Sequence, residues 1–202
     1  MAGIRRYIVG SAIVALLLFG GASVANAAAI IIDFGGGVAG GSVVISGNRY
    51  TGSGILVPLV QLINTPQNAG SYTTNAVLSF VYEFGVANQV TIIGGFAPAN
   101  IANGSTLMTG TFTSFNAMGT PSGIRIEGIG NDTKHRELVA FAGLPSNTIF
   151  QWNAFTLIAS TNTPGTYLPF STDVGNTAVP DAGSSLLLLG MGLVGLRMWR
   201  KR

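Results

Sequence analysis

Alternation between apolar and polar residues is the feature that most constrains the fold of this 202-residue chain. Every second residue of Ala76–Phe84 is apolar or aromatic; Leu107–Phe115 alternates in the same way, and Ile149–Ile158 does so less regularly in its second half. Successive side chains of a strand point to opposite faces, so this period of two predicts strands with one buried face. Further predicted strands are Ile30–Phe34, Gly41–Ser46, Ile55–Leu62, Gln89–Ile93, 124–127 and Glu137–Phe141.

Turn signals rich in Gly, Pro and Asn separate these segments, and the body shows no long window with a helical period of 3.6 residues. Eight or nine short strands at this spacing predict an all-β fold: a single β-sandwich domain, jelly-roll-like, over residues 28–158. Residues 159–178 are rich in Thr, Ser and Asn, and we interpret them as a spacer. A last strand at Tyr167–Phe170 is the alternative for part of this segment.

The C-terminal residues form a three-part pattern of turn, apolar run and basic cluster. The apolar run predicts a transmembrane helix over residues 184–199, whose 16 or so residues would span only about 24 Å. A transmembrane helix needs about 20 apolar residues to cross the hydrocarbon core of a bilayer, so this helix is short for a permanent anchor. The alternative is a core or amphipathic helix, but the run has no polar face. The turn is Val179, Pro180, Asp181, Ala182, Gly183 and Ser184, and the basic residues are Arg197, Arg200, Lys201 and Arg202.

This tail, residues 179–202, resembles the PEP-CTERM sorting signals and is most similar to their VPDSG-type variant. It departs from the variant in having Ala182 where Ser is usual and Ser185 where Thr is usual. The resemblance implies recognition by an exosortase, an integral-membrane, transpeptidase-like enzyme of bacteria that also make exopolysaccharide. It further implies transient tethering in the inner membrane, followed by display at the cell surface or release after processing.

The N-terminal residues 1–27 have the layout of a secretory signal peptide: two arginines, an apolar stretch and small residues before a cleavage site. We expect cleavage after Ala27, with Ala25 as the other small residue of the A-x-A site; cleavage after Ala29 is the alternative. This segment predicts the secretion translocon and signal peptidase as partners, by the general rather than the twin-arginine route. A retained N-terminal anchor is the competing interpretation.

The charge of the body excludes one class of partner. The whole chain carries +3, but six of its ten basic residues lie in the two terminal segments. The body keeps four basic and six acidic residues, a net charge of −2, so we expect no nucleic-acid partner. The chain has no cysteine, which excludes a disulfide and a thiolate nucleophile or metal ligand.

Candidate chemistry is confined to one polar cluster, Asp132, His135 and Glu137. The sole histidine beside a carboxylate could act as a general base or weak metal ligand, but we favour the simpler interpretation of a charged loop between two strands. A calcium site at Asn131 and Asp132 is an alternative that hard oxygen ligands would allow. We expect no catalytic residue, no metal site and no cofactor.

Two functional classes remain open. The first is a non-enzymatic exported surface or extracellular-matrix protein with a structural or adhesive role linked to exopolysaccharide or biofilm. The second is a secreted glycan-binding module or glycan-acting enzyme, in which exposed aromatic rings would stack on sugars. The aromatic residues considered for that role are Tyr50, Tyr72, Tyr82 and Trp152.

Overall fold

The computed structural model describes residues 29–37 and 40–179. The predicted signal peptide with Ala25 and Ala27, the motif residues from Pro180 onward, the predicted helix 184–199 and the basic cluster lie outside the described residues. Within the described part, no helix is both long and apolar enough to cross a membrane.

Strands dominate the described residues, so the all-β prediction is confirmed. The order includes a short 3₁₀ helix, η1 (Ala97–Ala99), and one α-helix, α2 (Arg136–Phe141). The strands are β1 (Ile31–Gly36), β2 (Ser42–Ser46), β3 (Arg49–Ile63), β4 (Gly70–Glu83), β5 (Ala87–Phe96), β6 (Ile101–Thr120), β7 (Gly123–Lys134), β8 (Ile149–Thr163) and β9 (Thr166–Val179).

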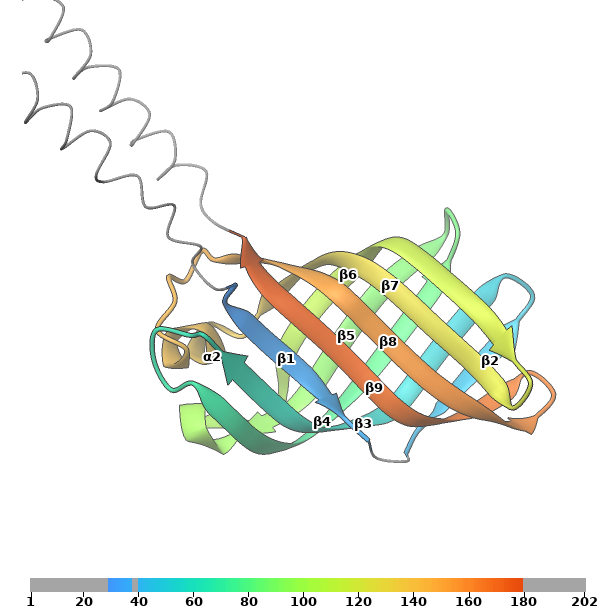
Figure 1. Ribbon diagram of the computed structural model, residues 1–202, viewed down its shortest axis with the longest axis horizontal. Coiled ribbons are helices and arrows are strands. Elements are labelled where there is room, and N and C mark those ends of the chain that lie inside the picture. Colours follow the sequence, from blue (N-terminus) through green and yellow to red (C-terminus); the bar gives the residue numbers. More distant parts are fainter. Residues whose placement is uncertain (1–28, 38–39, 180–202) are drawn as a thin grey trace, which may run out of the picture.

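All nine strands belong to one antiparallel sheet that closes on itself as a barrel (Figure 1). From β3 to β9 each strand pairs with the next, and the short strands β1 and β2 both lie between β9 and β3. The structure therefore does not have the two stacked sheets of the predicted sandwich. The two architectures share an alternation of inward apolar and outward polar residues, which is why the sequence pattern could not separate them.

The interior of the closed sheet is filled by apolar side chains, and it is lined from every strand. Phe112 sits at the centre of an aromatic cluster, with its ring stacked on Trp152 at 4.9 Å between centroids and edge-on to Phe155 at 5.2 Å. Among the most deeply buried side chains are Ile32, Phe34, Val57, Leu78, Ile92, Leu107, Ile126, Phe150 and Leu157.

β-Bulges shift which residues face the interior along single strands. In β8 the register shifts between Trp152 and Ala154, so that Phe150 and Trp152 are buried before the shift and Phe155 and Leu157 after it. A bulge adds one residue to one strand and reverses the alternation beyond it. This bulge explains why the apolar alternation predicted for Ile149–Ile158 is irregular in its second half.

Two predicted elements are wrong. Glu137–Phe141, predicted as a strand, belongs to α2, whose buried residues are Leu138 and Val139. Residues 159–178, predicted as a spacer, form the end of β8 and nearly all of β9, which pairs with β1, β2 and β8. The polar, glycine-containing sequence of this segment hid a strand that is stabilised by neighbours on both sides. The folded domain therefore extends to Val179.

The two ends of the described chain lie side by side at one end of the barrel (Figure 1). Their contact is a backbone hydrogen bond, donated by Ala178 N to Ile30 O at 2.9 Å. The sorting pattern that begins at Val179 thus follows directly on a strand of the closed sheet.

Candidate functional site

The structure separates the polar cluster predicted from the sequence. The carboxylate of Asp132 points into the barrel, where it is buried. His135 is the N-cap of α2, and its Nδ1 accepts a hydrogen bond from the backbone N–H of Glu137 at 3.3 Å. The carboxylate of Glu137 instead pairs with the preceding residue, Arg136, at 2.9 Å, in a largely exposed position. The three side chains therefore have three different roles and share no common cleft.

Metal binding finds no support in this arrangement. Among residues 29–37 and 40–179, no three His, Asp or Glu side chains gather closely enough to hold a metal ion. Asn131, the other residue of the calcium alternative, is exposed on the outer face of β7, opposite in direction to its neighbour Asp132.

A buried ion pair occupies the barrel interior instead. Lys134 Nζ lies 2.6 Å from Asp132 Oδ2, and neither side chain has any exposed area. Burial lowers the pKa of Lys134 to about 8, with the charges of Asp132 and Asp33 opposing the shift, and burial raises the pKa of Asp132 against the opposing charge of Lys134. Both shifts reduce the free-energy gap between the charged pair and the neutral amine and acid.

Aromatic rings surround the amine of this pair. Lys134 Nζ lies 4.7 Å from the ring centroid of Phe150 and 5.2 Å from that of Phe34. The electron-rich faces of these rings stabilise a cation where water is excluded.

Two further polar side chains are buried in the barrel interior, on β8 and β9. Trp152 and Asn176 sit directly opposite each other on β8 and β9, and both are fully buried. The Asn176 amide donates from Nδ2 to the Val174 carbonyl at 2.8 Å, while its Oδ1 has no hydrogen-bond partner among the described residues. Asp132 Oδ1 and the indole N–H of Trp152 also lack a partner there. Buried polar atoms without a partner are costly and uncommon, so three such atoms in the barrel interior suggest a role beyond packing.

Sequence reasoning missed the interior position of Lys134, although a signal for it existed. Ile124 and Ile126 face the barrel interior, and continuing their alternation along β7 places Asp132 and Lys134 on the same face. The charges of residues 131–137 suggested a solvated loop, and that interpretation overrode the alternation.

Of the aromatic residues considered for sugar binding, Trp152 lies in the core and the three tyrosines are partly buried and pack against it. The ring of Tyr82 stacks on Phe115 at 4.0 Å between centroids, and that of Tyr50 contacts Phe115 at 5.0 Å. Tyr72 contacts Phe96 and Phe141, and Trp152 is fully buried. Core packing therefore explains all four.

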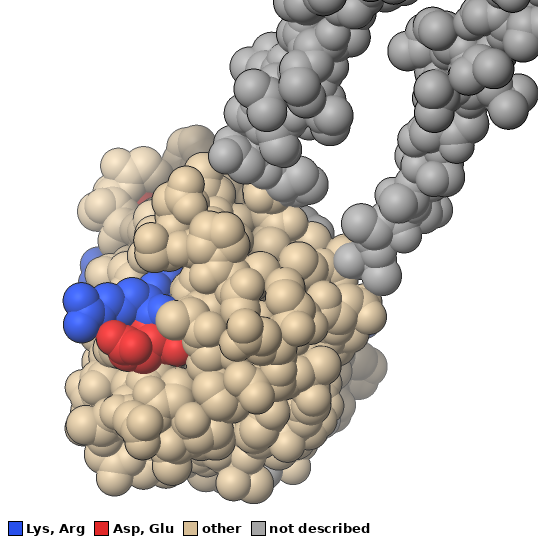
Figure 2. All heavy atoms as spheres, turned by 90° about the vertical axis from the view of Figure 1, so that its left-hand side faces the viewer, with Lys and Arg blue, Asp and Glu red and all other residues tan. Residues whose placement is uncertain are grey.

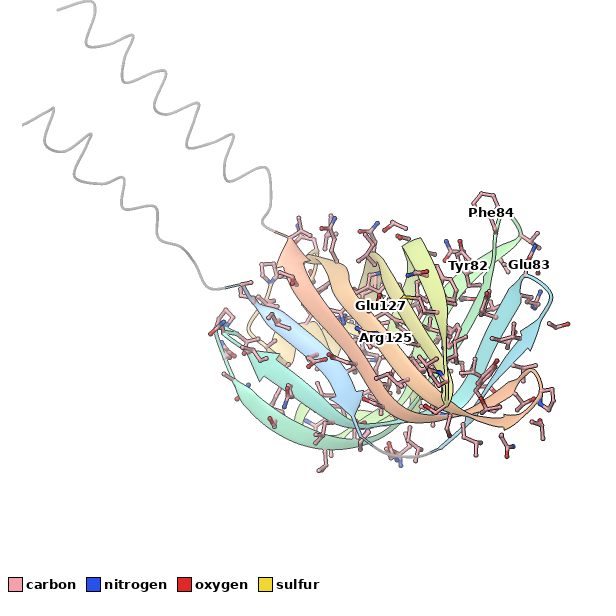
Figure 3. All side chains as sticks on the ribbon, turned by 45° about the vertical axis from the view of Figure 1, so that its right-hand side comes forward. Tyr82, Glu83, Phe84, Arg125 and Glu127 are labelled. Carbon is pink, nitrogen blue, oxygen red and sulfur yellow. The ribbon has the colours of Figure 1, made fainter. Side chains whose placement is uncertain are left out.

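A different aromatic residue, Phe84, projects into solvent with 84% of its surface exposed. It lies at the tip of the connection between β4 and β5, beyond Tyr82 and Glu83, and points away from the barrel (Figure 3). A shallow groove of about 340 Å³ runs beside it, lined in part by Asn88, Val86 and Thr113.

The outer surface carries few charges, and the end view in Figure 2 is almost wholly neutral. Each of the four basic residues in the described part is paired with a carboxylate, as Arg49 is with Glu83 at 3.0 Å. A broad hollow of about 600 Å³ is lined in part by the uncharged polar residues Gln89, Thr109, Thr111, Asn131 and Thr133.

Two carboxyl groups of the body, Asp33 on β1 and Asp173 on β9, remain after the ion pairs are counted, and they account for its net charge of −2. Neither forms an ion pair with a described residue. Burial raises the pKa of Asp33 to about 7, and the neighbouring carboxyl of Asp173 adds to the shift through a shared hydrogen bond and like charge.

Comparison with known proteins bears on the end of β9 and the residues that follow it. Searches of curated proteins and of solved structures gave no match to this chain. A protein-family model for the VPDSG-CTERM motif matches residues 178–202. The match begins inside β9, at Ala178 and Val179, which pair with Phe150 and Ile149 of β8. The C-terminal segment of this chain is therefore a VPDSG-CTERM motif, a variant of the PEP-CTERM sorting signal that exosortases recognise.

Proposed function

We propose that this chain is a non-enzymatic exported protein of the cell surface or extracellular matrix, with a structural or adhesive role linked to exopolysaccharide or biofilm. In this proposal its precursor is tethered by the C-terminal helix and then processed by an exosortase. The observation that carries the proposal is the sorting motif, which starts within the last strand of a closed, nearly neutral barrel.

The position of the motif supports display of the barrel close to the processing enzyme. Because β9 ends at Val179, Pro180 and the residues after it follow the folded domain without an intervening spacer. A membrane enzyme that acts on this turn would work at the rim of the barrel, beside Ile30 and Ala178. The closed sheet also leaves few unpaired strand edges, which suits a protein held at high density outside the cell.

The separation of Asp132, His135 and Glu137 favours a non-enzymatic role. A general base needs a second group and a substrate within hydrogen-bond reach, and His135 instead accepts the hydrogen bond that caps α2.

Processing can be tested by mass spectrometry of the exported protein from isogenic strains with and without the exosortase. We expect a mature form that lacks the residues after the motif in the first strain and a full-length tail in the second. The same tail in both strains contradicts processing.

A variant in which Pro180–Gly183 are replaced by alanine tests recognition of the turn. We expect the variant precursor to stay in the inner membrane. The matched control is Asn162→Ala, an exposed residue near the end of β8, which should be displayed normally. Normal display of the motif variant contradicts recognition at this turn.

Phe84 favours the glycan-binding alternative as a second candidate function. An exposed ring beside a groove with amide and hydroxyl groups suits stacking on a sugar. Retention of the protein on immobilised exopolysaccharide should fall several-fold in Phe84→Ala and stay unchanged in Leu168→Ala, another exposed apolar residue. Equal retention of both variants and the parent protein contradicts this role.

A further inference from the structure

The barrel interior holds a buried amine–carboxyl pair, Lys134 and Asp132, and a buried carboxamide, Asn176 on β9. We propose that Lys134 and Asn176 join in an intramolecular isopeptide bond, which the folded protein forms by itself with Asp132 as the proton shuttle. The bond would fasten β7 to β9 across the interior. This inference is independent of the function proposed above.

The rings around the amine of Lys134 locate it over β9. Phe34 is the register partner of Val174, and Phe150 is the register partner of Ala178. Lys134 Nζ lies within 5.2 Å of the ring centroid of Phe34 and closer to that of Phe150. The amine therefore lies over the stretch of β9 between these two partners.

Asn176 is the inward-facing residue in the middle of that stretch. Val174 and Asn176 are both fully buried, and the intervening residue faces outward, as the alternation of a strand requires. Met108 supplies a second link: it is the register partner of Lys134 on β6, and its Sδ lies 3.9 Å from Asn176 Nδ2. Two independent sets of contacts thus place the amine and the carboxamide in the same region.

The environment prepares each group for the reaction. A buried lysine whose pKa is lowered to about 8 supplies the neutral amine that a nucleophile requires. Asp132 lies 2.6 Å from that amine, and burial raises the pKa of its carboxyl, so it can take up the proton. Asn176 Oδ1 and Asp132 Oδ1 have no hydrogen-bond partner among the described residues, which leaves the carbonyl free to be polarised by the acid.

The bonds balance without any further reactant. Lys134 Nζ, after giving its proton to Asp132, attacks Cγ of Asn176 while the protonated carboxyl of Asp132 donates a hydrogen bond to Oδ1. The C–N bond from Nζ to Cγ forms, and the bond from Cγ to Nδ2 breaks. Asp132 passes this first proton to the departing nitrogen, which leaves as ammonia. Its carboxylate then takes up the second proton that Nζ loses on becoming an amide nitrogen, so Asp132 ends protonated beside a neutral amide.

Such a bond would supply the covalent fastening that the chain cannot obtain from disulfides. The chain has no cysteine. A link between residues 134 and 176 would restrict the unfolded chain over the loop that contains α2 and β8, in the way that a disulfide does. It would also remove the charge of Lys134 from the interior.

Mass spectrometry of the folded, full-length protein after tryptic digestion tests the proposal directly. We expect no cleavage after Lys134, and we expect the peptide that ends at Arg136 to be joined to the peptide that contains Asn176. The joined pair should weigh less than the sum of the two peptides by one ammonia molecule. Separate peptides at their full masses overturn the proposal, whatever the variants do.

Two other mass changes must be distinguished from the expected one. Loss of ammonia from an unjoined peptide that contains Asn103 and Gly104 would indicate succinimide formation at that pair, and without the joined peptides it overturns the proposal. Loss of one water molecule, with Lys134 attached to Asp132, overturns the assignment to Asn176.

Variants assign the roles of the three residues. Asn176→Ala and Lys134→Arg should lose the joined peptide completely. Asp132→Asn keeps both reacting residues and should also leave them unjoined, with folding checked by circular dichroism. The matched control is Asn131→Ala, on the outer face of the same strand, which should form the bond fully. A joined peptide in Asp132→Asn contradicts the role of Asp132.

Discussion

Lys134 Nζ lies 2.6 Å from Asp132 Oδ2, two residues earlier on β7, and the two side chains are completely shielded from solvent. Residues two apart on a strand share a face, so local geometry alone brings this pair together once β7 forms. Its burial depends on the closure of the sheet, because the rings of Phe34 and Phe150 that cover the amine come from β1 and β8.

Removal of one partner should be far more costly than removal of both. In the Asn176→Ala background, where the proposed bond cannot form, Lys134→Met leaves the carboxyl of Asp132 buried without its partner, and we expect the free energy of unfolding at neutral pH to fall by about 3–5 kcal/mol. The double variant Asp132→Leu with Lys134→Met should recover most of this loss. Urea denaturation measures both, with Thr133→Ala, an exposed residue between them, as the control. A double variant no more stable than the single one contradicts the interpretation.

Asp33 should make stability fall as pH rises from about 4 to about 7. Its pKa is about 7 in the folded protein and 3.8 as the ordinary value, so in this window the folded state holds a proton that the unfolded chain has released. Because Asp33 is partly solvated, we expect a loss of only about 1–2 kcal/mol across the window.

The variant Asp33→Asn should remove this dependence on pH, and Asp173→Asn should weaken it. Thermal unfolding between pH 4 and pH 8 measures the slope. Glu83→Gln, whose carboxylate pairs with Arg49 on another part of the sheet, serves as the control and should keep the slope. An unchanged slope in Asp33→Asn would mean that another group is responsible.

Gly130 should tolerate no side chain. A Cβ atom at this position would collide with the indole of Trp152 and with the carbonyl oxygen of Thr111. We expect Gly130→Ala to lower the free energy of unfolding by about 1–3 kcal/mol and to change the near-ultraviolet circular dichroism as Trp152 moves. Gly119→Ala, where a Cβ atom would meet nothing within 4 Å, should change neither.

His135 should contribute to stability through the cap of α2 and not through catalysis. His135→Ala removes the acceptor for the N–H of Glu137, and we expect a loss of about 1 kcal/mol in the free energy of unfolding. His135→Asn, which can accept the same hydrogen bond, should retain most of the stability. A variant that kept full stability but lost a biochemical activity would instead favour the enzymatic alternative.

Several features of the fold could be predicted from single segments. The alternation in Ala76–Phe84 and Leu107–Phe115 identified β4 and β6, because a half-buried strand needs one apolar face wherever it lies. The alternation failed where a bulge reversed it, as at Trp152 and Ala154 in β8, since an extra residue leaves no mark in the composition. It failed at Glu137–Phe141 because a segment of this length fits a helix turn or a strand equally well.

The sorting motif and most of the strands could be identified from the sequence alone. The sorting motif is recognised as a linear pattern, so its residues could be read without a fold. The tertiary structure was needed to show that the strands close into one sheet, that residues 166–179 complete it, and that Lys134 and Asp132 form an ion pair buried in its interior. Those relationships depend on pairing between residues far apart in the chain, and the periodicity of one strand carries no information about its neighbours.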